Sequence, residues 1–343
     1  MARHGIFHAN VSIEMSARFS DIVSEKEHYM NLTAEKEHLK TDHITGLMRH
    51  CTLCPRECGA DRLNGQLGYC GMPSDLYAAR AALHMWEEPC ISGESGSGTV
   101  FFSGCPLRCV YCQNHEIAIG KTGKPVSVSR LSEIFLELQD KQAHNINLVT
   151  PTHFVPQIAA SLRLAKKNGL HLPVVYNTSG YEKPETLRLL EGLVDIYLPD
   201  CKYAAAESGR RYSNAYDYFP VAKKALAEMF RQVGDPVFDR DTGLMKRGMI
   251  VRHLVLPGQT ADSKAVIEYL YRTYGDRIYI SIMNQYTPIS RFPEHPELNR
   301  TLTEAEYDEA VDFAIALGVE NGFIQEGETC MESFIPPFDC EGI

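Results

Sequence analysis

The sequence of 343 residues has no apolar run long enough to form a transmembrane helix. The stretch 142–162 contains no Asp, Glu, Lys or Arg, but Asn145, Pro151 and Pro156 interrupt it as a membrane span. Charged residues are scattered through 1–30, so this stretch lacks the apolar core of a signal peptide. We therefore expect a cytoplasmic protein that does not associate with a membrane.

Positive charge is also scarce in this chain. There are 34 Lys and Arg residues against 44 Asp and Glu residues, which gives a formal net charge of −10. An acidic protein repels a phosphate backbone unless it carries a local basic patch, and no such patch is evident in the sequence. The charge balance therefore predicts no nucleic-acid partner. An apolar content of 44% is ordinary for globular proteins and excludes a disordered or fibrous chain.

Cysteine, in contrast, is abundant and unevenly distributed. Eight of the 11 cysteines fall between Cys51 and Cys112. The cytosol keeps thiols reduced, so clustered cysteines there more often bind a metal or an iron–sulfur cluster than form disulfides.

A regular alternation of strand and helix patterns begins near residue 98. The predicted strands are 99–103, 146–150, 173–177, 194–198, 249–256 and 278–283. The predicted helices are 129–141, 155–168, 183–191, 218–233, 263–274 and 303–317, the last opening with a capping box from Thr303 to Glu306. Such alternation requires a parallel sheet with right-handed crossovers. We predict an α/β fold, a partial (β/α)6 TIM-like barrel, although a doubly wound sheet has the same linear pattern.

The remaining sequence does not follow this rhythm. We predict an N-terminal helical segment over 1–50, a cysteine-rich module and connector over 51–97, the barrel over 98–328 and a C-terminal tail over 329–343. The glycine-rich stretch 93–98 precedes a strand instead of following one, so we interpret it as a linker and not as a dinucleotide-binding loop.

The strongest motif is Cys105-Pro-Leu-Arg-Cys109-Val-Tyr-Cys112, directly after the first predicted strand. The loop at the carboxyl end of a barrel strand is where this architecture places its chemistry. Three thiolates can hold a four-iron, four-sulfur cluster and leave one iron free for another ligand. A zinc site with a distant fourth ligand and three unligated core cysteines are the alternatives.

This loop resembles the signature of the radical S-adenosylmethionine (SAM) superfamily, including the aromatic residue, Tyr111, before the third cysteine. The segments 104–114 and 252–258 resemble an uncharacterised iron–sulfur group related to pyruvate formate-lyase activating enzymes. The resemblance implies that Cys105, Cys109 and Cys112 ligate a [4Fe-4S] cluster whose free iron binds SAM. It also implies reductive cleavage of SAM to a 5′-deoxyadenosyl radical, which requires an electron donor such as flavodoxin or ferredoxin.

Polar residues at the ends of further predicted strands are candidate SAM ligands by the same resemblance. Together with Tyr111 they are Thr150, Thr152, His153, Asn177, Asp200, Lys202 and Arg252. The superfamily usually has a Gly-Gly-Glu stretch after the second strand, where this chain has the segment 150–153. Each of these residues could instead be an ordinary solvated loop residue.

Four upstream cysteines, Cys51, Cys54, Cys58 and Cys70, form a possible second metal site. Four soft ligands suit zinc or a second iron–sulfur cluster, and a thiol-lined fold without metal is the alternative. The isolated cysteines are expected to be small apolar fillers; they are Cys90, Cys201, Cys330 and Cys340. Packing or surface roles are expected for two further groups: His84, Trp86, Glu87 and Glu88, and Tyr212, Tyr216 and Tyr218.

Three functions are compatible with these patterns. The resemblance favours an activating enzyme that abstracts hydrogen from a glycine of a partner protein, such as a glycyl radical enzyme. A radical SAM enzyme acting on a small molecule or peptide is the second, and a non-catalytic iron–sulfur or zinc protein is the third.

Overall fold

The computed structural model describes residues 46–325 and 336–343. Most of the predicted N-terminal segment 1–50 and the isolated Cys330 therefore lie outside the described residues. The helices and strands from Arg62 onward belong to one compact unit, Met48–Ile343.

Six parallel strands form the centre of the sheet, and each corresponds to a predicted strand. They are β2 (Ser97–Phe102), β4 (Ile146–Val149), β5 (Val174–Thr178), β6 (Ile196–Pro199), β8 (Met245–Leu254) and β9 (Tyr279–Met283). They lie side by side in chain order, whereas a doubly wound sheet reverses its order at a switch point. This order confirms the partial barrel.

One register row shows how the strands share a buried face. Val100 pairs with Leu148, which pairs with Tyr176, followed by Tyr197 and Met249. All five are fully buried and belong to the core between the sheet and its covering helices. Burial of such large apolar side chains stabilises the fold by about 1.5–3 kcal/mol each.

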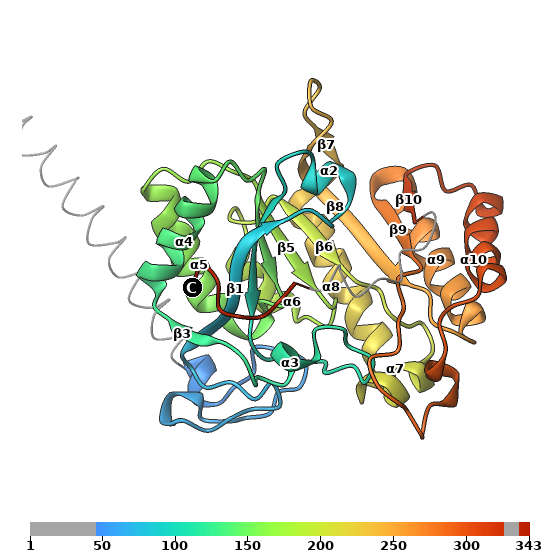
Figure 1. The fold of residues 1–343 in the computed structure, drawn as a ribbon, viewed down its shortest axis with the longest axis horizontal. Coiled ribbons are helices and arrows are strands. Elements are labelled where there is room, and N and C mark those ends of the chain that lie inside the picture. The colour runs from blue at the N-terminus through green and yellow to red at the C-terminus, as the bar shows by residue number, and fades with distance from the viewer. Residues whose placement is uncertain (1–45, 326–335) are drawn as a thin grey trace, which may run out of the picture. The chain divides into compact units, whose positions relative to one another are not determined.

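The predicted helices are also present. They are α4 (Val128–Asp140), α5 (Val155–Lys167), α6 (Pro184–Leu187) with η3 (Arg188–Leu190), α8 (Tyr218–Val233), α9 (Thr260–Tyr274) and α10 (Glu304–Leu317). Figure 1 shows α4 and α5 at one side, α9 and α10 at the other, and the strands between them. In α4, the buried Leu131, Ile134, Phe135 and Leu138 repeat at helical spacing and form the face that packs on the sheet. The capping box of Thr303 and Glu306 at the start of α10 is confirmed.

Several elements were not predicted from the sequence. The connector contains β1 (Leu76–His84), which pairs antiparallel with β2. The shorter strands are β3 (Lys124–Val126), β7 (Val237–Phe238) and β10 (Gly322–Ile324), and the shorter helices are α2 (Pro89–Ser92), α3 (His115–Ala118) and α7 (Ala206–Ser213). Single-turn 3₁₀ helices are η1 (Arg62–Asn64), η2 (Thr152–Phe154), η4 (Gly275–Arg277) and η5 (Pro296–Asn299). Strand β1 is rich in alanine, so its conformation is decided by pairing and not by intrinsic propensity.

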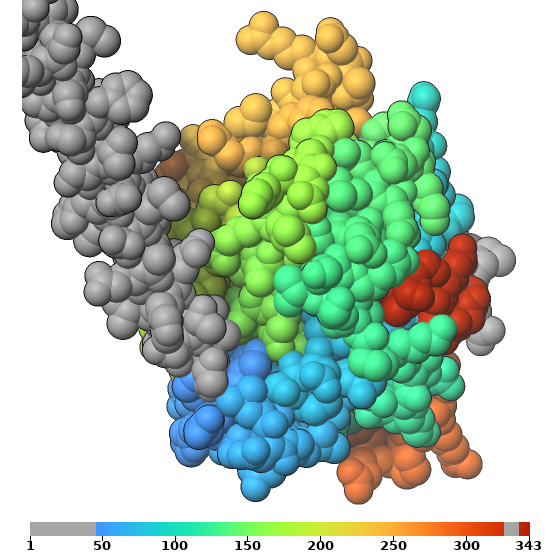
Figure 2. Space-filling view, turned by 90° about the vertical axis from the view of Figure 1, so that its left-hand side faces the viewer, coloured from blue at the N-terminus to red at the C-terminus, as the bar shows by residue number. Residues whose placement is uncertain are grey.

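The cysteine-rich module and the C-terminal residues pack on the barrel. Figure 2 shows the module, in blue, below the green helices of the barrel. Residues 336–343 lie beside β1. The Cys340 N–H donates to the Ala79 carbonyl, and the Ala81 N–H donates to the Glu341 carbonyl. Within the described ranges, no helix has the length and apolar character needed to cross a bilayer.

Candidate active site at the carboxyl ends of the strands

The carboxyl ends of the parallel strands meet at one cavity of about 240 Å³. The cysteine loop after β2 lines it, together with residues at or just beyond the ends of β4, β5, β6, β8 and β9. This is the end of a β/α barrel at which catalytic residues gather.

Cys105, Cys109 and Cys112 all line this cavity. The backbone N–H groups of Leu107 and Arg108 donate to the Cys105 sulfur at 3.4 and 3.5 Å. Arg108 has a φ of 53°, in the left-handed region, which turns the loop back on itself. The Ser213 hydroxyl donates to the Cys109 sulfur at 3.1 Å, so α7 also orients this loop.

Burial governs the ionisation of Cys105 and Cys112 in the protein alone. It raises the pKa of Cys105 to about 11 and raises the pKa of Cys112 further. Buried thiols lose their protons when a metal cation supplies the compensating charge. The environment of the loop therefore suits thiols that are ionised by iron.

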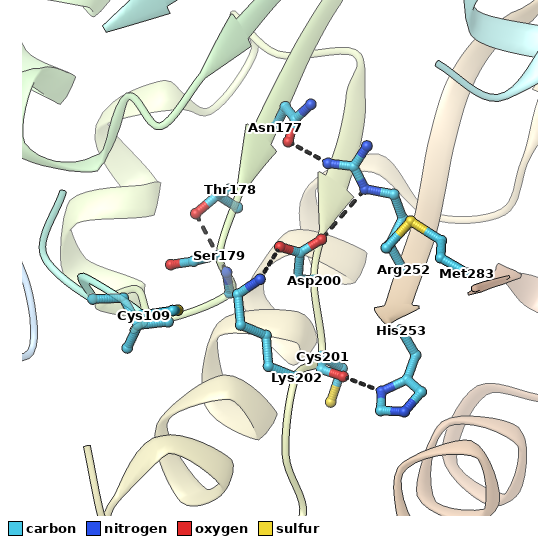
Figure 3. Close-up of polar contacts among 12 residues, drawn as sticks. Cys109, Asn177, Thr178, Ser179, Asp200, Cys201, Lys202, Arg252, His253 and Met283 are labelled. Carbon is cyan, nitrogen blue, oxygen red and sulfur yellow. Dashed lines mark hydrogen bonds and ion pairs between the residues drawn. The ribbon is translucent and has the colours of Figure 1, made fainter. Parts of the chain in front are cut away.

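Arg252 on β8 is the centre of a polar network on the same cavity (Figure 3). Its guanidinium lies 2.9 Å from a Glu87 carboxylate oxygen and 3.3 Å from a carboxylate oxygen of Asp200. It also donates to the Asn177 side-chain oxygen at 2.5 Å. The Lys202 ammonium lies 2.5 Å from the second Asp200 oxygen. Two cations and two carboxylates thus meet in the lining of the cavity.

The network keeps Asp200 and Lys202 charged at neutral pH. Burial opposes ionisation of Asp200, but Lys202 and Arg252 outweigh it and hold the pKa of Asp200 below its usual value. Burial also disfavours the Lys202 ammonium, but Asp200 and its neighbours raise the pKa of Lys202 above its ordinary value. The site therefore offers both a carboxylate and an ammonium to a bound zwitterion.

The structure brings most of the predicted SAM ligands to this cavity. Its lining includes Tyr111, Thr150, Asn177, Asp200, Lys202 and Arg252. Thr150 has a φ of 58°, an unusual conformation for a β-branched residue. Such strained residues cluster at functional sites, where the surrounding structure holds them in place.

Thr152 and His153 are placed differently, behind the cavity wall. The Thr152 hydroxyl donates to Glu182 at 2.5 Å. The His153 ring bonds to the Ser103 carbonyl at 2.7 Å, and burial lowers the pKa of His153 to about 3. Neither residue lines the cavity, and His153 is an uncharged, fully buried side chain.

Three residues assigned to packing or surface by the sequence line the cavity instead: His84, Trp86 and Glu87. Besides the ion pair with Arg252, Glu87 accepts from the side-chain amides of Asn147 at 2.8 Å and Asn177 at 3.3 Å. The neighbouring Glu88 is buried, which raises its pKa. The sequence signal for this part of the site was the pair of adjacent carboxylates, Glu87 and Glu88, after an alanine-rich segment. Their position at the cavity depends on the pairing of β1, which the sequence did not predict.

The tyrosines and isolated cysteines follow the predicted packing roles in most cases. Tyr212 and Tyr218 are buried in the cluster that surrounds the cysteine loop, whereas Tyr216 is 72% exposed. The Tyr111 hydroxyl, beside the third cysteine, bonds to the Tyr203 hydroxyl at 2.7 Å. Cys90 and Cys201 are buried among apolar residues and Cys340 is half-buried.

The upstream cysteines lie in the cysteine-rich segment and do not line the cavity. Cys51, Cys54 and Cys70 are buried and Cys58 is exposed. In the part of the chain that the structure describes, no three Cys, His, Asp or Glu side chains are gathered as ligands of one metal ion. A four-iron cluster separates its thiolates more widely than a single ion does, because each thiolate binds a different iron.

Comparison with known proteins agrees with the site. The family model described as the Radical SAM superfamily matches residues 99–270, half of the chain. The uncharacterized protein MJ0674 of Methanocaldococcus jannaschii is 29% identical over 287 residues, covering 80% of this chain and 77% of that protein.

Two solved structures are also similar. A radical SAM methyltransferase from Sphaerobacter thermophilus has 13% identity and a TM-score of 0.48, covering 67% of this chain and 66% of that one. A domain of pyruvate-formate lyase-activating enzyme from Bacteroides vulgatus has 12% identity and a TM-score of 0.36, covering 50% of this chain and 92% of that one. The match over residues 99–270 includes the cysteine loop and the ends of β4, β5, β6 and β8, and this protein belongs to the radical SAM superfamily.

Proposed function

We propose that this protein cleaves SAM reductively and abstracts a hydrogen atom from a glycine of a partner protein, as an activating enzyme does. The observation that carries the proposal is that one cavity holds both the three-cysteine loop and the charged network centred on Arg252. A redox or structural protein without catalysis would have no use for two cations and two carboxylates beside its cluster.

The residues present fit the two cofactors of the superfamily. The three thiols of the loop would hold the [4Fe-4S] cluster, and their N–H and O–H donors stabilise negative charge on sulfur. When bound, the reduced cluster and SAM supply the one-electron chemistry that breaks the sulfonium carbon–sulfur bond. The protein must position the reacting groups and exclude water.

The strand-end network matches the functional groups of SAM. Lys202 and Arg252 can donate to a carboxylate, and Asp200 and Glu87 can accept from an ammonium or from ribose hydroxyls. Asn177 provides a neutral donor and acceptor between them. The network is already paired within the protein, so the ligand replaces some of these contacts without leaving a charge unpaired.

A protein substrate is the target that we infer. Trp86 lines the cavity and is 61% exposed, so an aromatic surface is accessible to an incoming chain. Aromatic side chains of this kind anchor protein contacts. The net charge of −10 argues against an RNA substrate, which would need a basic surface.

Two measurements test this function. Anaerobically reconstituted and reduced protein should convert SAM to 5′-deoxyadenosine and methionine, identified by chromatography. Replacing Cys105, Cys109 and Cys112 by Ala should abolish this conversion, whereas Cys340→Ser should retain it. Absence of turnover with the cluster loaded would contradict reductive cleavage.

The target is tested separately by electron spin resonance. Incubation with candidate partner proteins should produce a carbon-centred glycyl radical, followed by oxygen-dependent cleavage of the partner at that glycine. Transfer of deuterium from a labelled small molecule or peptide into 5′-deoxyadenosine, without modification of any partner, would replace the protein target by that substrate.

A further inference from the structure

The upstream loop Cys54-Pro-Arg-Glu-Cys58 repeats the local design of the loop Cys105-Pro-Leu-Arg-Cys109. In both, the residue before the second cysteine has a positive φ, 40° at Glu57 and 53° at Arg108. In both, the N–H group two residues after the first cysteine donates to its sulfur. The geometry that orients two ligands of the cluster loop is therefore present a second time.

The other two upstream cysteines lie beside this loop. The Cys51 N–H donates to the Ala60 carbonyl, and the Gly59 N–H donates to the Cys51 carbonyl. These two hydrogen bonds hold the end of the 54–58 loop beside Cys51. A Cβ at Gly68 would lie 2.7 Å from the Cys58 sulfur and 3.9 Å from the Cys70 sulfur. Only glycine leaves room there for the Cys58 thiol, and Cys70 is in ordinary contact distance of the same position. Cys70 interacts electrostatically with Cys51, and Cys54 interacts with both.

Arg62 is the observation that points to a negatively charged occupant. Its side chain is fully buried against this cluster, with its guanidinium 3.8 Å from the Cys51 sulfur. Its other polar contacts are carbonyl oxygens, those of Pro73 at 2.6 and 3.1 Å and of His153 at 2.7 Å. Among the described residues, no carboxylate lies within ion-pair distance of Arg62. The carbonyl oxygens and the Phe154 ring, 5.6 Å from the guanidinium carbon, carry no net charge. A negative charge beside Arg62 would therefore offset the cost of burying this cation.

We propose that Cys51, Cys54, Cys58 and Cys70 bind an iron–sulfur cluster as four thiolates and that Arg62 compensates its charge. Four thiolates on a cluster whose core has a charge of +2 give a net charge of −2. The buried guanidinium beside Cys51 neutralises part of it. The site is saturated by its four ligands and is distinct from the Cys105–Cys112 loop. The proposal of this second site can therefore be tested independently of the proposed reaction.

The same module contacts the cluster loop directly. Arg56, between Cys54 and Cys58, donates to the Pro106 carbonyl at 2.8 Å and to the Ser213 carbonyl at 2.8 Å. Ser213 is the residue whose hydroxyl bonds to the Cys109 sulfur. A metal that fixes the upstream loop therefore also fixes the arginine that braces the cluster loop.

The experiment uses the full chain with Cys105, Cys109 and Cys112 replaced by Ala, purified without oxygen. We expect iron with matching acid-labile sulfide after incubation with Fe²⁺ and sulfide, and no stoichiometric zinc after incubation with Zn²⁺ alone. Adding Cys58→Ser should lower the bound metal at least tenfold. Cys58 is exposed, so this change should leave the far-ultraviolet circular dichroism unchanged. Cys340→Ser is the matched control and should retain the metal.

A second measurement tests Arg62 and does not depend on the triple variant. In the otherwise unchanged chain, Arg62→Met should speed metal release to a chelator at least fivefold from the upstream site, and Arg62→Lys should restore part of the difference. Cys58→Ser alone should remove the metal of the upstream site. It should leave unchanged the absorbance of the cluster at Cys105, Cys109 and Cys112. A folded triple variant that takes up no metal, or one that keeps its metal after Cys58→Ser, would overturn the proposal.

Discussion

The buried side chain of Glu182 allows a quantitative test of how burial changes the pKa of a carboxyl group in this protein. Its side chain is fully buried, and burial raises its pKa from 4.5 to about 7. The hydroxyls of Thr152, Thr178 and Tyr176 all donate to the same carboxyl oxygen, Oε1. The other oxygen, Oε2, has no partner. The three hydroxyls favour the carboxylate, but burial outweighs them and keeps the carboxyl group protonated up to about pH 7.

The sign follows from the raised pKa. Between about pH 4.5 and 7 the folded state holds a proton on Glu182 that the unfolded chain has released, so stability falls as the pH rises. The loss is complete above about pH 7. Each pKa unit is worth about 1.4 kcal/mol, so the total is about 3 kcal/mol. Unfolding entropy of about 2.1 cal/mol/K per residue converts this into a thermal midpoint lower by about 5 °C.

Glu182→Gln removes this titration and retains an oxygen at the Oε1 position. We expect its thermal midpoint to exceed that of the unchanged chain by about 5 °C at pH 8, with the gap narrowing to about 1 °C at pH 5. A partnerless amide nitrogen would shift the variant equally at every pH, so the narrowing of the gap is the quantity to measure. Circular dichroism at one scan rate from pH 5 to 8 provides it.

The groups around Glu182 do not titrate in this window. Burial raises the pKa of Cys54 to about 12 and raises the pKa values of Tyr176 and Tyr197 above their usual range. Glu228→Gln is the control, because Arg231 and Gln232 hold the pKa of Glu228 below its usual value and its removal should lower the midpoint at neutral pH. Parallel pH profiles for the unchanged chain and Glu182→Gln would refute the reasoning.

Three further predictions concern the site and the fold. Asp200→Asn should weaken SAM binding to the cluster-loaded protein at least tenfold, measured by equilibrium dialysis, because Lys202 and Arg252 lose their shared carboxylate. Thr303→Ala removes the capping box of α10 and should lower the free energy of unfolding by about 1 kcal/mol in urea denaturation. Gln142→Gly should raise it by about 1 kcal/mol in the same assay, because Gln142 has a φ of 65° after α4. Unchanged binding by Asp200→Asn, or unfolding free energies that move in the opposite direction, would contradict these predictions.

The sequence by itself determined the parts of this protein that depend on local pattern. Apolar runs and helical periodicity identified the six parallel strands and their helices. These patterns are visible in the sequence because each helix must bury one apolar face against the sheet. The cysteine spacing identified the loop after β2, because cluster ligation needs thiols at short, fixed separations. Strand ends could be recognised as well, so Asn177, Asp200 and Arg252 were expected at one edge of the sheet.

Tertiary structure decided which distant residues line the cavity. Antiparallel pairing ends β1 beside Ser97 at the amino end of β2, so Glu87 reaches the cavity from the opposite end of the strands and contacts Asn147 within β4. This pairing has no local signature in an alanine-rich segment. Thr152 and His153 follow β4 as expected, but the short helix η2 turns them behind the wall, where Glu182 and the Ser103 carbonyl bind their side chains. Arg62 lies beside Cys51 through contacts within the module, and packing of the module on the barrel adds the hydrogen bond from its guanidinium to the His153 carbonyl. These placements depend on contacts between residues far apart in the chain, which periodicity and motif spacing do not encode.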